Sequence, residues 1–290
     1  MKWFDYECPK TVEAAVALLA TPGRSARALA GGTDIIVQLR TGRREADLVV
    51  DIKEIPELNV LSYSATTGLT VGAAVPCYRI YSDDVIQRLY PGLADTASLI
   101  GGTQIQGRAS IGGNLVNAAP SADAVPVLIA LSARCVIAGP NGDRVAPVEE
   151  FAIAPGKTQL QPGELLVALR MPPPEPHSGS RYLRFIPRNE MDIAVAGAGV
   201  YVVLDGDSFV SARIALASIA PTPLFVPEAG AALAGKPVND TSIAAAAALA
   251  MDAAQPITDM RGTAAYRRHL CGVLVKRALQ DAVKRAREGN

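Results

Sequence analysis

Histidine, cysteine and aromatic residues are scarce in this sequence. Its 290 residues include two histidines and four cysteines, and 5% are aromatic. The cysteines stand far apart, at Cys8, Cys77, Cys135 and Cys271, so no spacing typical of zinc or iron–sulfur binding is present. We therefore expect four unpaired thiols and no metal site made by this chain alone. So few aromatic side chains also argue against a surface that stacks nucleic-acid bases.

Neither charge nor long hydrophobic runs are in excess. The 28 lysines and arginines balance 28 aspartates and glutamates, so the sequence carries no electrostatic footprint of nucleic-acid binding. The longest apolar tract, Ile243–Met251, is too short to cross a bilayer, and the first residues lack the apolar core of a signal peptide. We expect a cytoplasmic protein without a membrane span. Its 49% of hydrophobic residues suffice for one large or two moderate domains.

Common catalytic and phosphate-binding motifs are missing as well. No G-x-G-x-x-G follows a predicted strand and no Walker A motif occurs, so a Rossmann or P-loop nucleotide site is not supported. No G-x-S-x-G nucleophile elbow occurs either.

Two pairs of adjacent glycines, about eighty residues apart, are the most informative feature that is present. The first lies in Ala30–Asp34 (A-G-G-T-D) and the second in Ser110–Asn114 (S-I-G-G-N). Adjacent glycines permit positive φ and let a ligand approach the backbone without a Cβ clash, and successive N–H groups form concavities that bind anions. Together the pairs predict a ligand with two phosphates, although each pair alone is also typical of an ordinary tight turn.

The pattern of the first half predicts an α+β organisation. A strand at 26–30, a helix at 34–40 and a strand at 48–52 should form a small parallel unit, with the first glycine pair where a helix N-terminus attracts anions. A mainly antiparallel sheet should follow, with a hairpin turn at Asn141-Gly142. Its expected strands are 69–75, 134–138, 144–148 and 163–171, and the expected helices of this half are 12–19, 83–89, 93–100 and 122–133.

A proline-rich segment at 172–179 marks the clearest boundary, because such runs continue neither a helix nor a central strand. We expect a first domain at 1–175, divided into a parallel part at about 1–55 and an antiparallel part at about 56–175, and an α+β domain at 176–290. The second domain should contain a strand at 181–186, a hairpin of 196–204 with 209–219, and helices at about 241–254 and 263–287.

Taken together, the two glycine segments resemble the FAD-binding signatures of the medium, flavoprotein subunit of the molybdenum hydroxylases, the xanthine dehydrogenase and carbon monoxide dehydrogenase family. Gly163–Leu166, Met191–Ala194 and Asp259–Arg268 resemble further segments of that family, in the same order. The resemblance implies a vanillyl-alcohol-oxidase (PCMH)-type FAD-binding domain, followed by a small α+β domain of the carbon monoxide dehydrogenase flavoprotein C-terminal type.

The resemblance also implies which residues bind FAD. The two glycine segments should hold the pyrophosphate from both sides, Asp123 should bond the ribityl or flavin end, and Leu166 should line the adenine end. Ile100 is placed near one flavin face, while Asn117 and Arg184 stand at or next to positions where relatives have threonine and lysine. The full expected set is Leu29, Ala30, Gly31, Gly32, Thr33, Asp34, Ile100, Gly101, Ser110, Ile111, Gly112, Gly113, Asn114, Asn117, Asp123, Leu166 and Arg184.

The function that the resemblance implies is electron transfer. A large partner would carry a molybdenum-pterin cofactor and a small partner two 2Fe–2S clusters, in a dimer of heterotrimers. FAD on this chain would pass electrons to NAD, quinone, oxygen or another acceptor. We expect no catalytic acid or base here, because the cofactor performs the chemistry. The cysteine-bearing insertion of the 4-hydroxybenzoyl-CoA reductase branch is absent from the sequence.

Two alternatives stay open. A self-contained FAD oxidase or reductase of the vanillyl-alcohol-oxidase fold would need its own substrate pocket, and the two histidines and short C-terminal part argue against it. A non-catalytic scaffold, in which the glycine pairs are only structural, would bind no flavin.

Overall fold

A parallel three-stranded sheet and two helices begin the chain. The computed structural model describes residues 2–289. In chain order the first elements are β1 (Asp5–Glu7), α1 (Val12–Leu19), β2 (Ala26–Leu29), α2 (Ile35–Arg40) and β3 (Leu48–Asp51). The strand order is β1-β3-β2 and both pairings are parallel, which confirms the predicted β-α-β unit. Strand β1 was not predicted, because all three of its residues are exposed and carry no alternating pattern.

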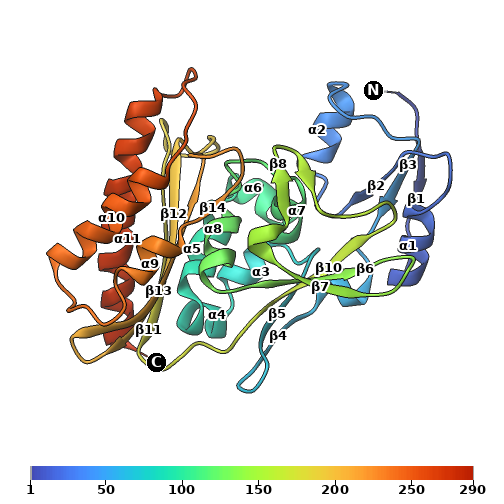
Figure 1. The fold of residues 1–290 in the computed structure, drawn as a ribbon. Coiled ribbons are helices and arrows are strands. Elements are labelled where there is room, and N and C mark those ends of the chain that lie inside the picture. Colours follow the sequence, from blue (N-terminus) through green and yellow to red (C-terminus); the bar gives the residue numbers. More distant parts are fainter. Residues whose placement is uncertain (1, 290) are drawn as a thin grey trace.

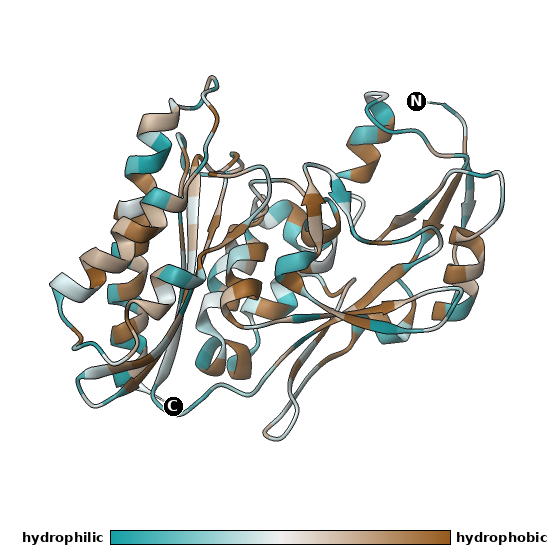
Figure 2. Cartoon of the chain, viewed as in Figure 1, coloured by the Kyte–Doolittle hydropathy of each residue, from teal (hydrophilic) through white to brown (hydrophobic). Residues whose placement is uncertain are grey.

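A five-stranded antiparallel sheet forms the middle of the molecule (Figure 1). Its order is β4-β5-β10-β6-β7, and the predicted β6–β7 hairpin is confirmed, with Gly142 at φ +107°. In Figure 2 these strands are mostly hydrophobic, whereas the loop tips are hydrophilic. The strands are β4 (Leu61–Ser64), β5 (Gly68–Gly72), β6 (Arg134–Ala138), β7 (Arg144–Pro147) and β10 (Leu165–Met171), and β8 (Ala152–Ala154) pairs separately with β9 (Lys157–Thr158).

Six helices lie between β5 and β6 in the chain. They are α3 (Cys77–Tyr81), α4 (Asp84–Leu89), α5 (Pro91–Leu99), α6 (Thr103–Gln106), α7 (Ile111–Val116) and α8 (Ala124–Ala130), and short 3-10 turns occupy Pro56–Asn59 and Val148–Glu150. The predicted helices at 83–89 and 93–100 are present, and the second begins at Pro91, because proline fits the first helical position. Helices α3, α6 and α7 have four to six residues, too few to show a helical period.

The C-terminal part is an antiparallel sheet between two helical layers. Its order is β11 (Ser178–Phe185), β12 (Ala196–Asp205), β13 (Ser208–Ala217) and β14 (Leu224–Phe225). Strand β11 begins three residues before the predicted 181, within the segment expected to be extended. The remaining elements are α9 (Pro227–Ala231), α10 (Asp240–Ala253) and α11 (Ala264–Glu288). No helix among residues 2–289 combines the length and apolar character that a membrane crossing needs.

Helices from the first part of the chain and from its C-terminal part sandwich this C-terminal sheet. Helix α11 packs on β11 and β12, while α5 and α8 pack on the same sheet (Figure 1). The helices approach closely, since a Cβ on Gly179 would lie 2.1 Å from the Ala282 carbonyl oxygen and one on Gly199 would lie 2.5 Å from the carbonyl carbon of Pro126. Asp95 of α5 forms ion pairs with Arg181 and Arg285, at 3.0 and 2.7 Å. The two parts therefore share one continuous interface; the division at residue 175 stays a prediction.

Candidate functional site

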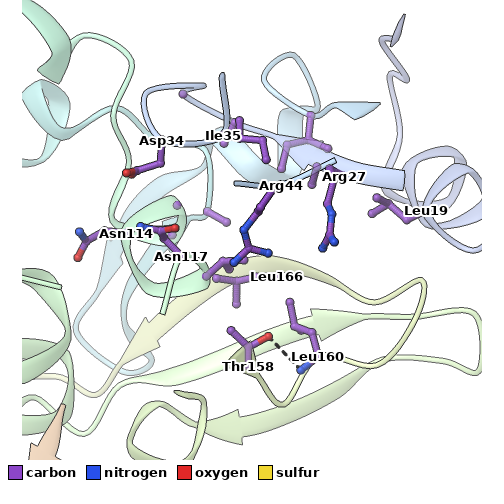
Figure 3. A pocket seen from close by; sticks show the side chains of 18 of the residues that line it. Leu19, Arg27, Asp34, Ile35, Arg44, Asn114, Asn117, Thr158, Leu160 and Leu166 are labelled. Carbon is purple, nitrogen blue, oxygen red and sulfur yellow. Dashed lines mark hydrogen bonds between the residues drawn. The ribbon is translucent and has the colours of Figure 1, made fainter. Parts of the chain in front are cut away.

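A cavity of about 780 Å³ lies between the parallel unit and the five-stranded sheet. Its wall includes residues of β2, the loop after β2, α2, α7, the β8–β9 hairpin and β10 (Figure 3). Both glycine segments lie on this wall. The volume falls within the range of roughly 300–1,000 Å³ found for small-molecule and cofactor sites.

In the first glycine segment the two glycines have different roles. Gly32 has φ +80°, in the left-handed region that favours glycine. Gly31 does not have a positive φ; instead, a Cβ there would lie 2.2 Å from the Arg108 carbonyl oxygen. The Arg108 Nε also donates to the Gly31 carbonyl oxygen at 2.9 Å. Gly31 therefore permits close contact between two chain segments, and the expectation of positive φ holds only for Gly32.

The second glycine pair lies in a helix, which corrects the expectation of a tight turn. Gly112 and Gly113 belong to the first turn of α7, and the Ser110 hydroxyl caps it by accepting the Gly113 N–H at 3.0 Å. A Cβ on Gly112 would lie 2.4 Å from the Ala73 carbonyl oxygen, whereas one on Gly113 would meet only the Ser110 Oγ, at 3.1 Å. Gly112 is therefore required for packing, and Gly113 leaves open space at the cavity wall.

Twelve of the seventeen expected residues line the cavity. They are Ala30, Gly31, Gly32, Thr33, Asp34, Ile100, Ser110, Gly112, Gly113, Asn114, Asn117 and Leu166. Asn117 also accepts a hydrogen bond from the Gln38 side chain at 2.9 Å, which joins α2 to the end of α7. Leu29 and Ile111 are buried behind the wall, and Gly101 does not line it.

Asp123 and Arg184 also lie outside the cavity wall, and they form a buried ion pair. The Arg184 guanidinium lies 2.7 Å from one Asp123 carboxylate oxygen, and the Tyr182 hydroxyl donates to the other at 2.7 Å. Burial raises the pKa of the Asp123 carboxyl, and the Arg184 charge opposes this rise. Both carboxylate oxygens thus have protein partners in this structure, and the contact of Asp123 with the ribityl or flavin end stays a prediction.

The sequence interpretation missed the basic residues of the cavity. Arg27 and Arg44 both line it, and Figure 3 shows their guanidinium groups pointing into it. The Arg44 guanidinium donates to the Gly156 carbonyl oxygen at 3.1 Å. Burial lowers the pKa of Arg44, and the positive charges of Arg27 and Arg43 lower it further. No motif marks Arg44, because its place at the cavity depends on the path of the loop between α2 and β3.

Cysteine chemistry has no place at this site. All four cysteines are free, and none lines the cavity. Burial raises the pKa of the Cys77, Cys135 and Cys271 thiols to about 12. Among residues 2–289 no group of three or more His, Cys, Asp or Glu side chains is placed to hold a metal ion.

Glu164 at the cavity edge gives a pH-dependent prediction. Its carboxylate accepts from Arg144 at 2.7 and 2.8 Å and from the Gln161 N–H at 2.7 Å, and the Arg144 hydrogen bond is the largest cause of its lowered pKa. A lowered carboxyl pKa stabilises the folded state at neutral pH, and that contribution is lost as pH falls through the folded pKa. We expect Glu164→Gln to cost about 1 kcal/mol at pH 7 and clearly less near pH 3. Urea unfolding of both proteins measures this difference; an equal loss at both pH values would contradict it.

Comparison with known proteins identifies two matching families along the chain. The FAD binding domain in molybdopterin dehydrogenase matches residues 2–174, and the CO dehydrogenase flavoprotein C-terminal domain matches residues 181–282. The expected fold class, an α+β FAD-binding part followed by a C-terminal part of this type, is confirmed.

Individual relatives match over nearly their full length. The chain is 34% identical over 284 residues to the carbon monoxide dehydrogenase medium chain of Afipia carboxidovorans, covering 98% of each chain. It is 32% identical over 283 residues to the xanthine dehydrogenase FAD-binding subunit of Escherichia coli, covering 97% of each. Its structure is similar to a chain of carbon monoxide dehydrogenase from Hydrogenophaga pseudoflava, with a TM-score of 0.94, 34% identity and 98% of each chain covered. The chain therefore belongs to the family of FAD-binding flavoprotein subunits of the molybdenum hydroxylases.

Proposed function

We propose that this chain binds FAD in the cavity described above and serves as the electron-transfer subunit of a heterotrimeric molybdenum hydroxylase. The observation that carries the proposal is the cavity itself: both glycine segments line it, in a chain that medium subunits of carbon monoxide and xanthine dehydrogenases match from end to end.

The residues present fit a dinucleotide with two phosphates. The absent side chain of Gly113 leaves room at the wall, since an added Cβ would meet only the Ser110 hydroxyl. Three arginines and Lys157 supply positive charge on the same wall, and apolar side chains such as Ile100 and Leu166 supply contact area. We assign the twelve lining residues to direct contact with FAD, and we keep Leu29, Gly101, Ile111, Asp123 and Arg184 as further proposed FAD-binding residues outside the lined wall.

Bound FAD would supply electron acceptance and release, and the protein would position it. This chain's residues would then have three tasks: to hold the phosphates, to fix the orientation of the ring system and to limit water access. No residue of the cavity is assigned as a general acid or base.

The proposal includes partners. Electrons would come from two 2Fe–2S clusters on a small subunit, after substrate oxidation at a molybdenum-pterin cofactor on a large one, and leave to NAD, quinone, oxygen or another acceptor. The similar structure is that of a carbon monoxide dehydrogenase from Hydrogenophaga pseudoflava that lacks the Mo-pyranopterin moiety of its molybdenum cofactor. Several relatives are named medium chains, a name that supports a multi-subunit assembly. A dimer of heterotrimers and a cytoplasmic location are part of the same proposal.

One purification tests this proposal. The protein is isolated at mild salt from its native host, an absorbance spectrum is recorded, and companion chains are separated on a gel. Flavin bands together with one large and one small companion are the expected result. A yellow single chain that oxidises a substrate by itself would instead support a self-contained oxidase. A colourless chain that takes up no added FAD would support a scaffold.

A further inference from the structure

Two of the three arginines that line the cavity, Arg27 and Arg44, lack counter-ions, whereas the third, Arg24, is paired with Asp5. Among residues 2–289, neither Arg27 nor Arg44 forms an ion pair with a carboxylate, and the Arg27 Nε is buried without a hydrogen-bond partner. Among the same residues, the Arg44 guanidinium has the Gly156 carbonyl oxygen as its one hydrogen-bond partner. Glu164, a carboxylate on the same wall, is already paired with Arg144.

The two positive charges are also close enough to affect each other. The charge of Arg27 is among the causes that lower the pKa of Arg44. Partly buried like charges without an anion are unfavourable. A wall that nevertheless holds two guanidinium groups toward one cavity is typical of a site for an anion.

We propose that Arg27 and Arg44 bind the phosphate on the adenosine side of the dinucleotide, and so make the site selective for FAD over FMN. This inference rests on the proposed function. Arg27 lies on β2 three residues before the first glycine segment, and Figure 3 shows Arg44 pointing toward the part of the cavity that Leu166 lines, the expected adenine end. A planar guanidinium matches the geometry of a phosphate and donates two hydrogen bonds to it.

FAD and FMN titrations of the full-length apoprotein, followed by flavin fluorescence, test the assignment. Arg27→Met and Arg44→Met should each raise the Kd for FAD about tenfold or more, because each removes charged hydrogen bonds to phosphate. Both variants should change the Kd for FMN less than about threefold, because FMN has no adenosine-side phosphate. Arg44→Lys should lose less FAD affinity than Arg44→Met, because lysine keeps the charge but not the two parallel hydrogen bonds of the guanidinium.

The matched control is Arg43→Met, which makes the same charge change at an exposed neighbour that does not line the cavity. It should leave the Kd for FAD within about threefold of the parent. Unchanged FAD affinity in both methionine variants, equal losses for FMN, an equal loss in Arg43→Met, or a lysine variant as weak as the methionine variant would each overturn the assignment. Failure of the unmutated protein to bind FAD would instead overturn the proposed function.

Discussion

Replacement of Gly113 by valine should abolish FAD binding while the protein stays folded. The new side chain would start at the cavity wall, where its Cβ meets only the Ser110 Oγ at 3.1 Å, and its two methyl groups would occupy space needed by the ligand. We expect the Kd for FAD to rise at least about a hundredfold, equivalent to about 2.7 kcal/mol. Flavin absorbance per mole of purified protein after incubation with FAD measures occupancy, and thermal unfolding reports the fold.

Gly112→Ala is the matched comparison, one residue away. Its Cβ would lie 2.4 Å from the Ala73 carbonyl oxygen, a backbone atom that cannot rotate aside. We expect this smaller substitution to lower soluble yield and melting temperature, in contrast to Gly113→Val. Full flavin occupancy in Gly113→Val would show that the ligand does not approach α7 at this position.

Removal of the Asp123 carboxylate should strongly destabilise the protein even without FAD. The side chain of Arg184 is only 6% exposed and has Asp123 as its ion-pair partner. Asp123→Ala leaves that buried charge uncompensated, a loss of about 3–5 kcal/mol in the free energy of unfolding. Urea unfolding of the apoprotein measures this loss directly.

Two further variants separate the charge from the hydrogen bond. Tyr182→Phe removes one hydrogen bond to the same carboxylate and should cost about 1.5–3 kcal/mol. The double variant Asp123→Ala with Arg184→Met removes both charges and should be less destabilised than the two single losses added together. If Asp123→Ala unfolds like the parent but binds FAD poorly, the carboxylate acts on the ligand and not on the fold.

Long elements with a strong pattern were predictable from the sequence. The β12–β13 hairpin and α11 agree with their predicted positions to within a few residues, because each buries one continuous apolar face against the other. The short helices were not predictable, because packing rather than local preference determines them. Helix α7 is the clearest case, because it contains two glycines, each of which disfavours a helix by about 1 kcal/mol. The helix nevertheless forms, with the Ser110 hydroxyl as its N-cap and Gly112 packed closely against Ala73.

The candidate site, too, was predictable from the sequence only in part. The glycine segments were recognisable, because their chemistry lies in consecutive residues, and both line one cavity. Side chains brought in from a distance were not, since Arg44 reaches the cavity from a loop whose path the sequence does not reveal. Asp123 was recognised as a residue of this region, but its partners Tyr182 and Arg184 come from a strand about sixty residues later in the chain.

The sandwiched C-terminal sheet has a consequence for synthesis of the protein. All seven residues of α8 are buried, and part of that cover comes from β12 and β13, which leave the ribosome roughly seventy to ninety residues later. At about 5–20 residues per second this delay lasts several seconds or more. During that time an apolar helix of the nascent chain lacks the part of its cover that β12 and β13 provide. The first part of the chain therefore reaches its final packing only after β13 of the C-terminal part has been synthesised.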